Sequence, residues 1–206
     1  MTPRTVNQSV AGPAGRIECA VDAPEGAPRG VAVVCHPHPQ AGGTMDNKVV
    51  QTLARAFVQL GWRSVRFNFR GVGGSQGTWD EGRGEVDDAL AVIAAVRAAG
   101  QPLLLAGFSF GAFVAAVAAS RLAEGDKAER LVLVGASTQK QQVPPVPEDT
   151  VLIHGETDDV VPLAATLDWA RPQSIPVIVF PGVGHFFHGR LGLLKTVVVR
   201  QLRADP

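Results

Sequence analysis

The sequence predicts an α/β protein in which a mainly parallel sheet of about eight strands carries helices on both faces. Short apolar runs alternate along the chain with segments of helical periodicity, and this alternation is typical of β-α-β units. The chain has 206 residues, of which 46% are hydrophobic and 18% are charged. That composition is enough for one buried core, so we expect a single domain spanning residues 1–206.

The elements follow in order along the chain. An antiparallel hairpin is expected first, with a strand over 5–11, a turn at 12–15 and an alternating second strand from Ile17 to Val21. Later strands are expected at Val31–Cys35, Ser64–Phe69, Leu103–Ala106, Leu131–Val134, Val151–Ile153 and Ile175–Phe180. Helices are expected at Asn47–Leu60, Glu81–Ala99, Ser109–Ala123, Leu163–Ala170 and Leu191–Leu202. Asp46 is the expected N-cap of the first helix and Gly61 its stop.

Composition narrows the possible partners. Lys plus Arg equals Asp plus Glu at 19 each, so the balance disfavours a nucleic-acid partner. We find no stretch apolar enough to span a membrane and no signal-like start, so we expect a cytoplasmic protein with no membrane partner. Cys19 and Cys35 are too few for a disulfide framework. The near-neutral charge makes a homodimer a reasonable expectation.

The segment after the Leu103 strand carries the first chemical motif. Gly107-Phe108-Ser109-Phe110-Gly111 is a G-x-S-x-G sequence between an expected strand and an expected helix. In that setting a tight turn exposes the serine hydroxyl at the edge of the sheet, and the glycines relieve crowding. Without that setting, the motif would indicate only a glycine-bounded turn. Ser109 is therefore the candidate nucleophile.

A serine hydroxyl needs a base and a carboxylate that orients the base. Asp158 and Asp159 follow the Val151 strand, and an H-G-x-x-D-x-x-V-P frame favours Asp158, which leaves Asp159 as a helix cap or a solvated residue. His185 follows the Ile175 strand on a glycine-flanked loop, and His188 is its rival. Ser, Asp, His is the chain order that this kind of turn requires.

Two backbone N–H groups should face the negative charge that develops during acyl transfer. Phe110, directly after the candidate nucleophile, is expected to supply one. The other is expected from the segment after the Val31 strand, His36-Pro37-His38-Pro39, in which the prolines have no N–H and His38 is the better placed donor.

Two further motifs are given other interpretations. His36 and His38 have the spacing of a zinc pair, but the other histidines lack matching positions, so no metal is expected. Gly71 to Gly77 resembles a dinucleotide-binding loop but has Gln76 where that motif needs glycine. We interpret it as a flexible loop beside the site.

These motifs together resemble the α/β-hydrolase superfamily. Four stretches, 36–39, 42–48, 66–71 and 184–190, are similar to small bacterial members related to dienelactone-hydrolase-like and serine-aminopeptidase-like hydrolases. The resemblance implies a Ser-His-Asp hydrolase with no cofactor. The chain departs from many members by having Pro37 where they have glycine, and from dienelactone hydrolases by having Ser109 where they have cysteine, so their substrate does not carry over.

The superfamily's cap domain usually follows the strand equivalent to Leu131–Val134, where this chain has only 15 residues, Gly135 to Asp149. We therefore expect no cap and an open pocket for a small acyl substrate, an ester or a thioester. Two alternatives stay open, which are a non-catalytic binding module and an amidase or peptidase with the same triad. The side chains expected to contact substrate are Met45, Phe108, Phe186 and Phe187, with His38, Phe110 and Trp79 as further possible walls.

Overall fold

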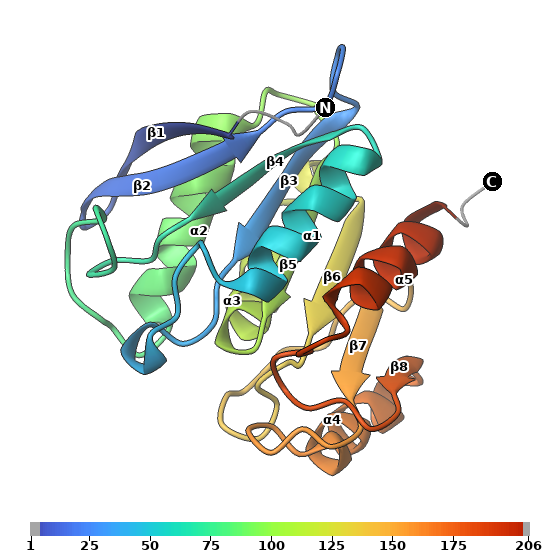
Figure 1. Ribbon diagram of the computed structural model, residues 1–206. Helices are drawn as coiled ribbons and strands as arrows, with labels where there is room; N and C mark the ends of the chain where they lie inside the picture. The colour runs from blue at the N-terminus through green and yellow to red at the C-terminus, as the bar shows by residue number, and fades with distance from the viewer. Residues whose placement is uncertain (1–4, 204–206) are drawn as a thin grey trace.

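The computed structural model describes residues 5–203, and its centre is an eight-stranded sheet in the order β1-β2-β4-β3-β5-β6-β7-β8 (Figure 1). The strands are β1 (Thr5–Gly12), β2 (Gly15–Asp22), β3 (Gly30–Cys35), β4 (Trp62–Phe67), β5 (Leu103–Phe108), β6 (Arg130–Val134), β7 (Val151–Gly155) and β8 (Val177–Phe180). β1 pairs with β2 and β2 pairs with β4 in antiparallel fashion, and every other pairing is parallel. The predicted fold class is confirmed.

The central strands are apolar throughout because both of their faces are covered. Every residue of β3 and of β5 is buried, as expected for parallel strands between two helical layers. The register sets Cys35 opposite Gly107 and Gly107 opposite Leu133. The carboxyl ends of β3, β5 and β6 therefore lie level, and the loops after them meet at one edge of the sheet.

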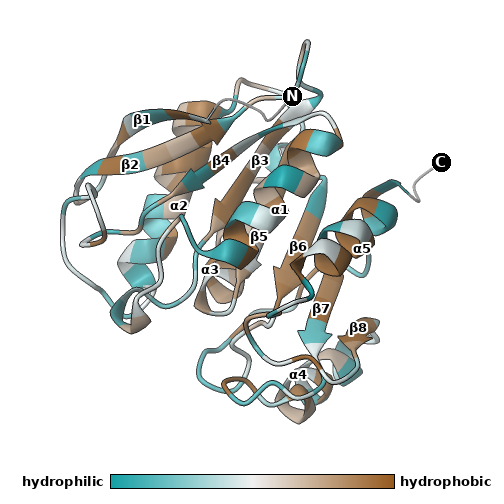
Figure 2. Cartoon of the chain, viewed as in Figure 1, coloured by the Kyte–Doolittle hydropathy of each residue, from teal (hydrophilic) through white to brown (hydrophobic). Residues whose placement is uncertain are grey.

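Helices cover the two faces in pairs. α1 (Lys48–Gln59) and α5 (Leu191–Arg203) pack on one face, and α2 (Arg83–Val96) and α3 (Phe110–Arg121) on the other (Figure 1). α4 (Leu163–Ala170) lies beyond them and places Ala170 in the α2–α3 core. The visible sides of α1 and α5 carry both hydrophilic and hydrophobic residues, whereas the central strands are mainly hydrophobic (Figure 2).

Some predicted boundaries are wrong for local reasons. Asn47, not Asp46, caps α1, because its side-chain oxygen accepts the N–H groups of Val49 and Val50. α2 starts two residues late, because Glu81 and Gly82 adopt left-handed φ angles of 54° and 95°. β4 spans 62–67 rather than 64–69, with its first residue opposite Gly30 of β3.

The Gly71 to Gly77 loop is tied down at several points, in contrast to the flexible loop that its sequence suggests. The Glu18 carboxylate accepts the N–H of Gly74 at 2.7 Å, and the Ser75 hydroxyl donates to the Asn68 carbonyl at 2.6 Å. Gln76 exchanges two hydrogen bonds with the backbone of Arg16. The loop therefore continues the pairing between β2 and β4 beyond the end of β4.

The segment between β6 and β7 forms no cap. Residues 135–149 contain no helix. Their Val143 carbonyl accepts the Trp169 indole N–H, and the Val146 N–H donates to Gln173. The segment thus packs against α4 and the turn after it. Within residues 5–203, we also find no helix with the length and apolarity that crossing a membrane requires.

Candidate active site

The turn between β5 and α3 holds Ser109 in a strained conformation. Its φ and ψ are 58° and −120°, values that a residue with a side chain rarely adopts. Glycines make the turn possible, since a Cβ on Gly107 would lie 2.0 Å from the Gly111 carbonyl oxygen, and one on Gly111 would lie 2.3 Å from the Cys35 carbonyl oxygen. A hydrogen bond from Ser109 N–H to the Val134 carbonyl, 2.9 Å long, fixes the turn to β6.

Three side chains from three loops form one hydrogen-bonded chain. The Ser109 Oγ lies 3.0 Å from His185 Nε2, and His185 Nδ1 lies 2.6 Å from Asp158 Oδ2. Because a carboxylate can only accept, Nδ1 carries the proton and Nε2 is free to accept the Ser109 hydroxyl proton. The structure thus brings together the three residues that the sequence singled out.

The rings around His185 limit how it can move. The Phe108 ring lies 4.8 Å from the imidazole and the Phe186 ring 5.0 Å, measured between centroids. Gly135 approaches the same ring, and a Cβ there would come within 3.3 Å of His185 Cε1. The imidazole is therefore confined to the plane in which it meets both Ser109 and Asp158.

The Asp158 carboxylate is surrounded by donors. Oδ1 accepts the backbone N–H groups of Val160 and Val161 at 2.9 and 2.8 Å. Oδ2 faces His185 and, at 3.4 Å, the Nε2 of His154. Burial by itself would raise the pKa of this carboxyl, but the hydrogen bonds from His185 and the two backbone amides hold the pKa below its usual range. Asp158 is therefore ionised at neutral pH.

His154 is a residue of this network to which the sequence reasoning assigned no role. It is fully buried at the end of β7, and its Nε2 also lies 2.9 Å from the Val161 carbonyl oxygen. Its Nδ1 lies 3.2 Å from the Thr166 hydroxyl, which in turn lies 3.4 Å from the Thr138 hydroxyl. Burial lowers the pKa of His154, so we assign a neutral ring with the proton on Nε2. The signal in the sequence that could have identified His154 is its place near the end of a buried strand, four residues before Asp158.

The loop after β3 is held by hydrogen bonds of its own backbone. The His38 carbonyl accepts the N–H groups of Ala41 and Gly43, which folds the loop back on itself. Met45, near the end of this loop, is held by two hydrogen bonds. Its N–H donates to the Asn68 side chain at 2.9 Å, and its carbonyl accepts from Arg66 of β4 at 2.9 Å. Phe110 is the first residue of α3, so its N–H has no acceptor within the helix.

His36, the first residue of this loop, connects it to the segment that follows β4. It is fully buried, its Nδ1 lies 2.7 Å from the Pro37 carbonyl oxygen, and its Nε2 accepts the Phe69 N–H at 3.1 Å. Burial lowers the pKa of His36 to about 4, so its ring is neutral. His38 lies nearer the surface, with its ring 4.6 Å from the ring of Trp79 and 5.2 Å from that of Phe110.

The four side chains expected to bind substrate lie in different environments. Met45, Phe108 and Phe187 are 5%, 0% and 0% exposed, which makes them core residues in this structure. Phe186 is 44% exposed and stands beside His185. The rings of His38 and Trp79 are half-buried. These three partly exposed rings, rather than the whole predicted set, face solvent near Ser109.

The rival residues lie outside the hydrogen-bonded chain. Asp159 is exposed and does not cap α4, whose N-cap is Pro162. His188 is exposed and its ring lies 5.8 Å from that of Phe186. Burial raises the pKa of the Cys19 thiol to about 12 and that of Cys35 further still, so neither is an activated thiol. Within residues 5–203, His, Cys, Asp and Glu form no group of three that could hold a metal ion.

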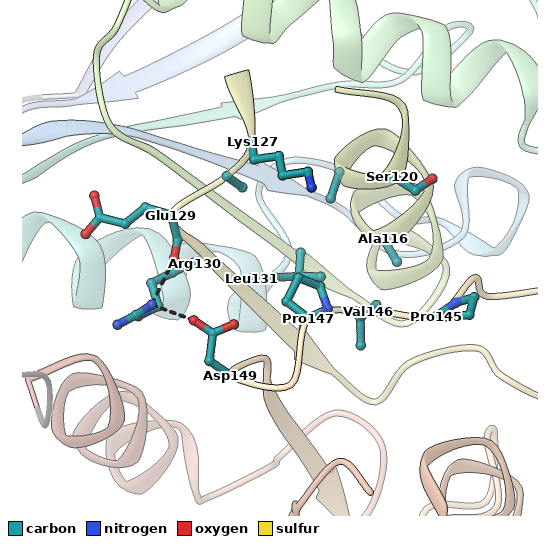
Figure 3. A pocket seen from close by; sticks show the side chains of 12 residues that line it. Ala116, Ser120, Lys127, Glu129, Arg130, Leu131, Pro145, Val146, Pro147 and Asp149 are labelled. Carbon is teal, nitrogen blue, oxygen red and sulfur yellow. Dashed lines mark hydrogen bonds and ion pairs between the residues drawn. The ribbon is translucent and has the colours of Figure 1, made fainter. Parts of the chain in front are cut away.

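A separate hollow of about 260 Å³ lies at the other end of α3, where β6 begins (Figure 3). Ala116 and Ser120 of α3 line one side, and Val146 and Pro147 line another. An ion pair of 2.6 Å between Arg130 and Asp149 bounds it. Since Ser109 precedes the first residue of α3, this hollow lies away from the turn at Ser109.

Comparison with known proteins assigns the chain to a family. A family model described as serine aminopeptidase, S33, matches residues 26–149. A solved structure from Coxiella burnetii, described as an alpha-beta serine hydrolase homologue, is 39% identical, covers 98% of both chains and has a TM-score of 0.83. The chain belongs to the α/β serine hydrolases.

Other relatives agree with this hydrolase fold. XC6422 from Xanthomonas campestris, described as a serine hydrolase without lid, is 36% identical over 100% of this chain and 99% of that chain, with a TM-score of 0.87. An uncharacterised Rickettsia prowazekii protein, RP471, is 45% identical over 107 residues, which is 50% of this chain but only 45% of that protein. The lidless architecture is therefore common to this hydrolase and XC6422.

Proposed function

We propose that this hydrolase cleaves small acyl esters or thioesters through an acyl-enzyme intermediate, with Ser109, His185 and Asp158 as its catalytic triad. The observation that carries the proposal is the hydrogen-bonded chain from the Ser109 hydroxyl through both nitrogens of His185 to the Asp158 carboxylate. Such a chain activates a hydroxyl for attack on a carbonyl carbon.

In the first half of the reaction, the Ser109 Oγ bonds to the acyl carbon as its proton passes to His185 Nε2. The carbonyl oxygen becomes an oxyanion, which the N–H groups of Phe110 and His38 bind. The carbonyl then re-forms, the bond to the leaving oxygen or sulfur breaks, and that atom takes the proton from His185.

In the second half, water attacks the acyl-Ser109 ester and gives its proton to His185. The second tetrahedral intermediate collapses, the Ser109 oxygen takes the proton back, and the carboxylic acid leaves. Asp158 remains ionised and keeps the proton of His185 on Nδ1 throughout.

An ester or thioester is favoured over a peptide by the environment of Glu85. An aminopeptidase needs a free carboxylate near the site to bind the substrate's ammonium group. Glu85 acts electrostatically on His38, but it is fully buried and accepts the N–H groups of Asp80 and Gly82. The Glu85 carboxylate is therefore occupied by hydrogen bonds at the start of α2 and does not bind an ammonium group. The absence of a cap also favours short acyl groups, so kcat/KM should be higher for short-chain than for long-chain esters.

Labelling with a fluorophosphonate probe, followed by peptide mass mapping, tests the proposal. We expect stoichiometric labelling at Ser109 that is lost in Ser109→Ala and in His185→Ala. Cys35→Ser, a buried change outside the hydrogen-bonded chain, serves as the control and should still label. No labelling of the folded natural protein would contradict the proposal and favour a non-catalytic binding module. Parallel assays with esters and aminoacyl-amides separate esterase from amidase activity.

A further inference from the structure

A groove of about 430 Å³ lies between α1 and α5, on the face of the sheet opposite to α2 and α3. Three cationic side chains line it, Lys48 and Arg55 from α1 and Lys195 from α5. No carboxylate is among its lining residues. The groove therefore concentrates positive charge in a concave surface.

The charged residues of these two helices are all positive. α1 and α5 contain no Asp or Glu, although the whole chain has as many acidic as basic residues. Within residues 5–203, Lys48 and Lys195 make no ion pair, and Arg55 contacts only the side chain of Gln51. The carboxylate of Asp46, which accepts a hydrogen bond from Gln51, is 3.1 Å from Arg66, and Arg66 is also paired with Asp22. The residues that line the groove themselves carry three positive charges and no negative charge.

Gly192 is a second and independent observation. It is the second residue of α5 and lines the groove, and a Cβ built on it would meet no atom within 4 Å. Packing and backbone conformation therefore do not require glycine here. What glycine does provide is an open groove wall in the first turn of the helix, where backbone N–H groups lack intrahelical acceptors.

The groove lies along the first turns of α1 and α5. α1 starts directly after the loop that carries His38, and α5 starts six residues after His185. Both helices begin at the edge of the sheet to which the strand arrowheads of β5 and β7 point (Figure 1). The longer, non-acyl part of a substrate held at Ser109 can extend from this edge over the outer surface of α1 and α5.

We propose that this groove binds a phosphate or pyrophosphate group carried by the leaving part of the ester or thioester substrate. Several cationic side chains and free backbone N–H groups around one concave space match the charge and the acceptor oxygens of a phosphate. The proposal rests on the hydrolase function proposed above and adds the chemical class of the leaving group.

A pair of substrates that differ by one phosphate tests this directly. The probes are S-butyryl phosphopantetheine and S-butyryl pantetheine. We expect kcat/KM to be about tenfold higher for the phosphorylated probe at low ionic strength, mainly through KM. About 0.5 M NaCl should remove most of that preference, because salt screens exposed charges.

Substitutions in the groove should remove the same preference. Lys48→Gln combined with Lys195→Gln should bring the ratio of the two kcat/KM values close to one and leave the unphosphorylated probe unchanged. Gly192→Ala, which favours the helix and alters no charge, should lower the ratio by narrowing the groove. Lys127→Gln, which removes a cation paired with Glu124 far from the groove, is the matched control and should keep the ratio.

Calorimetric titration of Ser109→Ala with inorganic pyrophosphate separates the two proposals. Saturable binding that the double lysine variant loses supports the groove, even if no thioester is cleaved. Equal kcat/KM for the two probes, with both cleaved, would overturn the groove proposal and leave the hydrolase proposal intact. Binding to anionic vesicles without binding to pyrophosphate would also overturn it and would assign the charge to a membrane surface.

Discussion

Two histidines contact the same carboxylate oxygen of Asp158, and their surroundings differ. His185 lies 2.6 Å from Oδ2 and its other nitrogen faces the Ser109 hydroxyl. His154 lies 3.4 Å from Oδ2, and its other nitrogen faces the buried hydroxyl of Thr166. Both imidazoles are almost fully buried. The residue type and its burial therefore do not set the role of each ring, which follows from the group that its second nitrogen contacts.

Removing the histidine that reaches Ser109 should have the largest effect. His185→Ala leaves the hydroxyl without a proton acceptor, so kcat/KM for a short-chain ester should fall by about 10⁴-fold or more. Steady-state kinetics and a thermal melt of the same preparation check this. A folded variant that keeps a tenth of the activity would show that His185 is not the base.

Changing the shared carboxylate should have the next largest effect. Asp158→Asn keeps an oxygen for the Val160 and Val161 amides but can present an N–H to His185 Nδ1, which favours the wrong tautomer. We expect kcat to fall by about 10³-fold with a small change in Tm. Asp159→Asn, an exposed neighbour, is the matched control and should retain full activity.

The pH dependence of stability should separate buried neutral histidines from the others. The folded state lowers the pKa of His36 from 6.5 to about 4. Between these values the unfolded chain binds a proton that the folded chain does not, so stability should fall as the pH falls, by up to about 3 kcal/mol. Burial lowers the pKa of His154 too, which adds to the same trend.

Urea unfolding at pH 7, 5.5 and 4.5 measures this trend. His36→Gln should be less stable than the natural protein at neutral pH and should lose less stability on acidification. An identical pH slope in the two proteins would contradict the assignment of His36 as a buried neutral ring.

The smallest effect on activity is expected from substitution of His154, which lies next to the Asp158 carboxylate. His154→Phe removes the imidazole whose Nε2 lies 3.4 Å from Asp158 Oδ2 and donates to the Val161 carbonyl, but it leaves Ser109 and His185 in place. We therefore expect kcat to fall by about tenfold while KM stays constant. His154→Gln, which retains an N–H group, should recover part of the loss. A folded His154→Phe with unchanged kcat would limit His154 to a role in packing.

Much of the site could be predicted because its signals are local. Ser109 lies between glycines at a strand-to-helix turn, and the order of Ser109, Asp158 and His185 along the chain matches one known arrangement. Asp158 was chosen over Asp159 from its motif frame, and His185 over His188 from its glycine-flanked loop after a strand. The hydrogen bonds join the same residues.

The less successful predictions depended on contacts between distant segments. Met45, Phe108 and Phe187 have the side chains expected of pocket walls, but each is at most 5% exposed. Phe108 and Phe187 pack in the core with residues of α1 and α5. The 71–77 loop has the composition of a flexible segment, yet hydrogen bonds to Glu18 and Arg16 fix it. The composition of a segment indicates its flexibility only in isolation, whereas these hydrogen bonds join the loop to residues of β2.

The sequence by itself determined the alternation of strands and helices and the tight turn at Ser109, because apolar periodicity and glycine sterics act over a few residues. Only the tertiary structure decided that His154 stands behind Asp158 and that the cations of α1 and α5 line one groove. Lys48 and Lys195 are almost 150 residues apart in sequence, and they meet because both helices pack on the same face of the sheet.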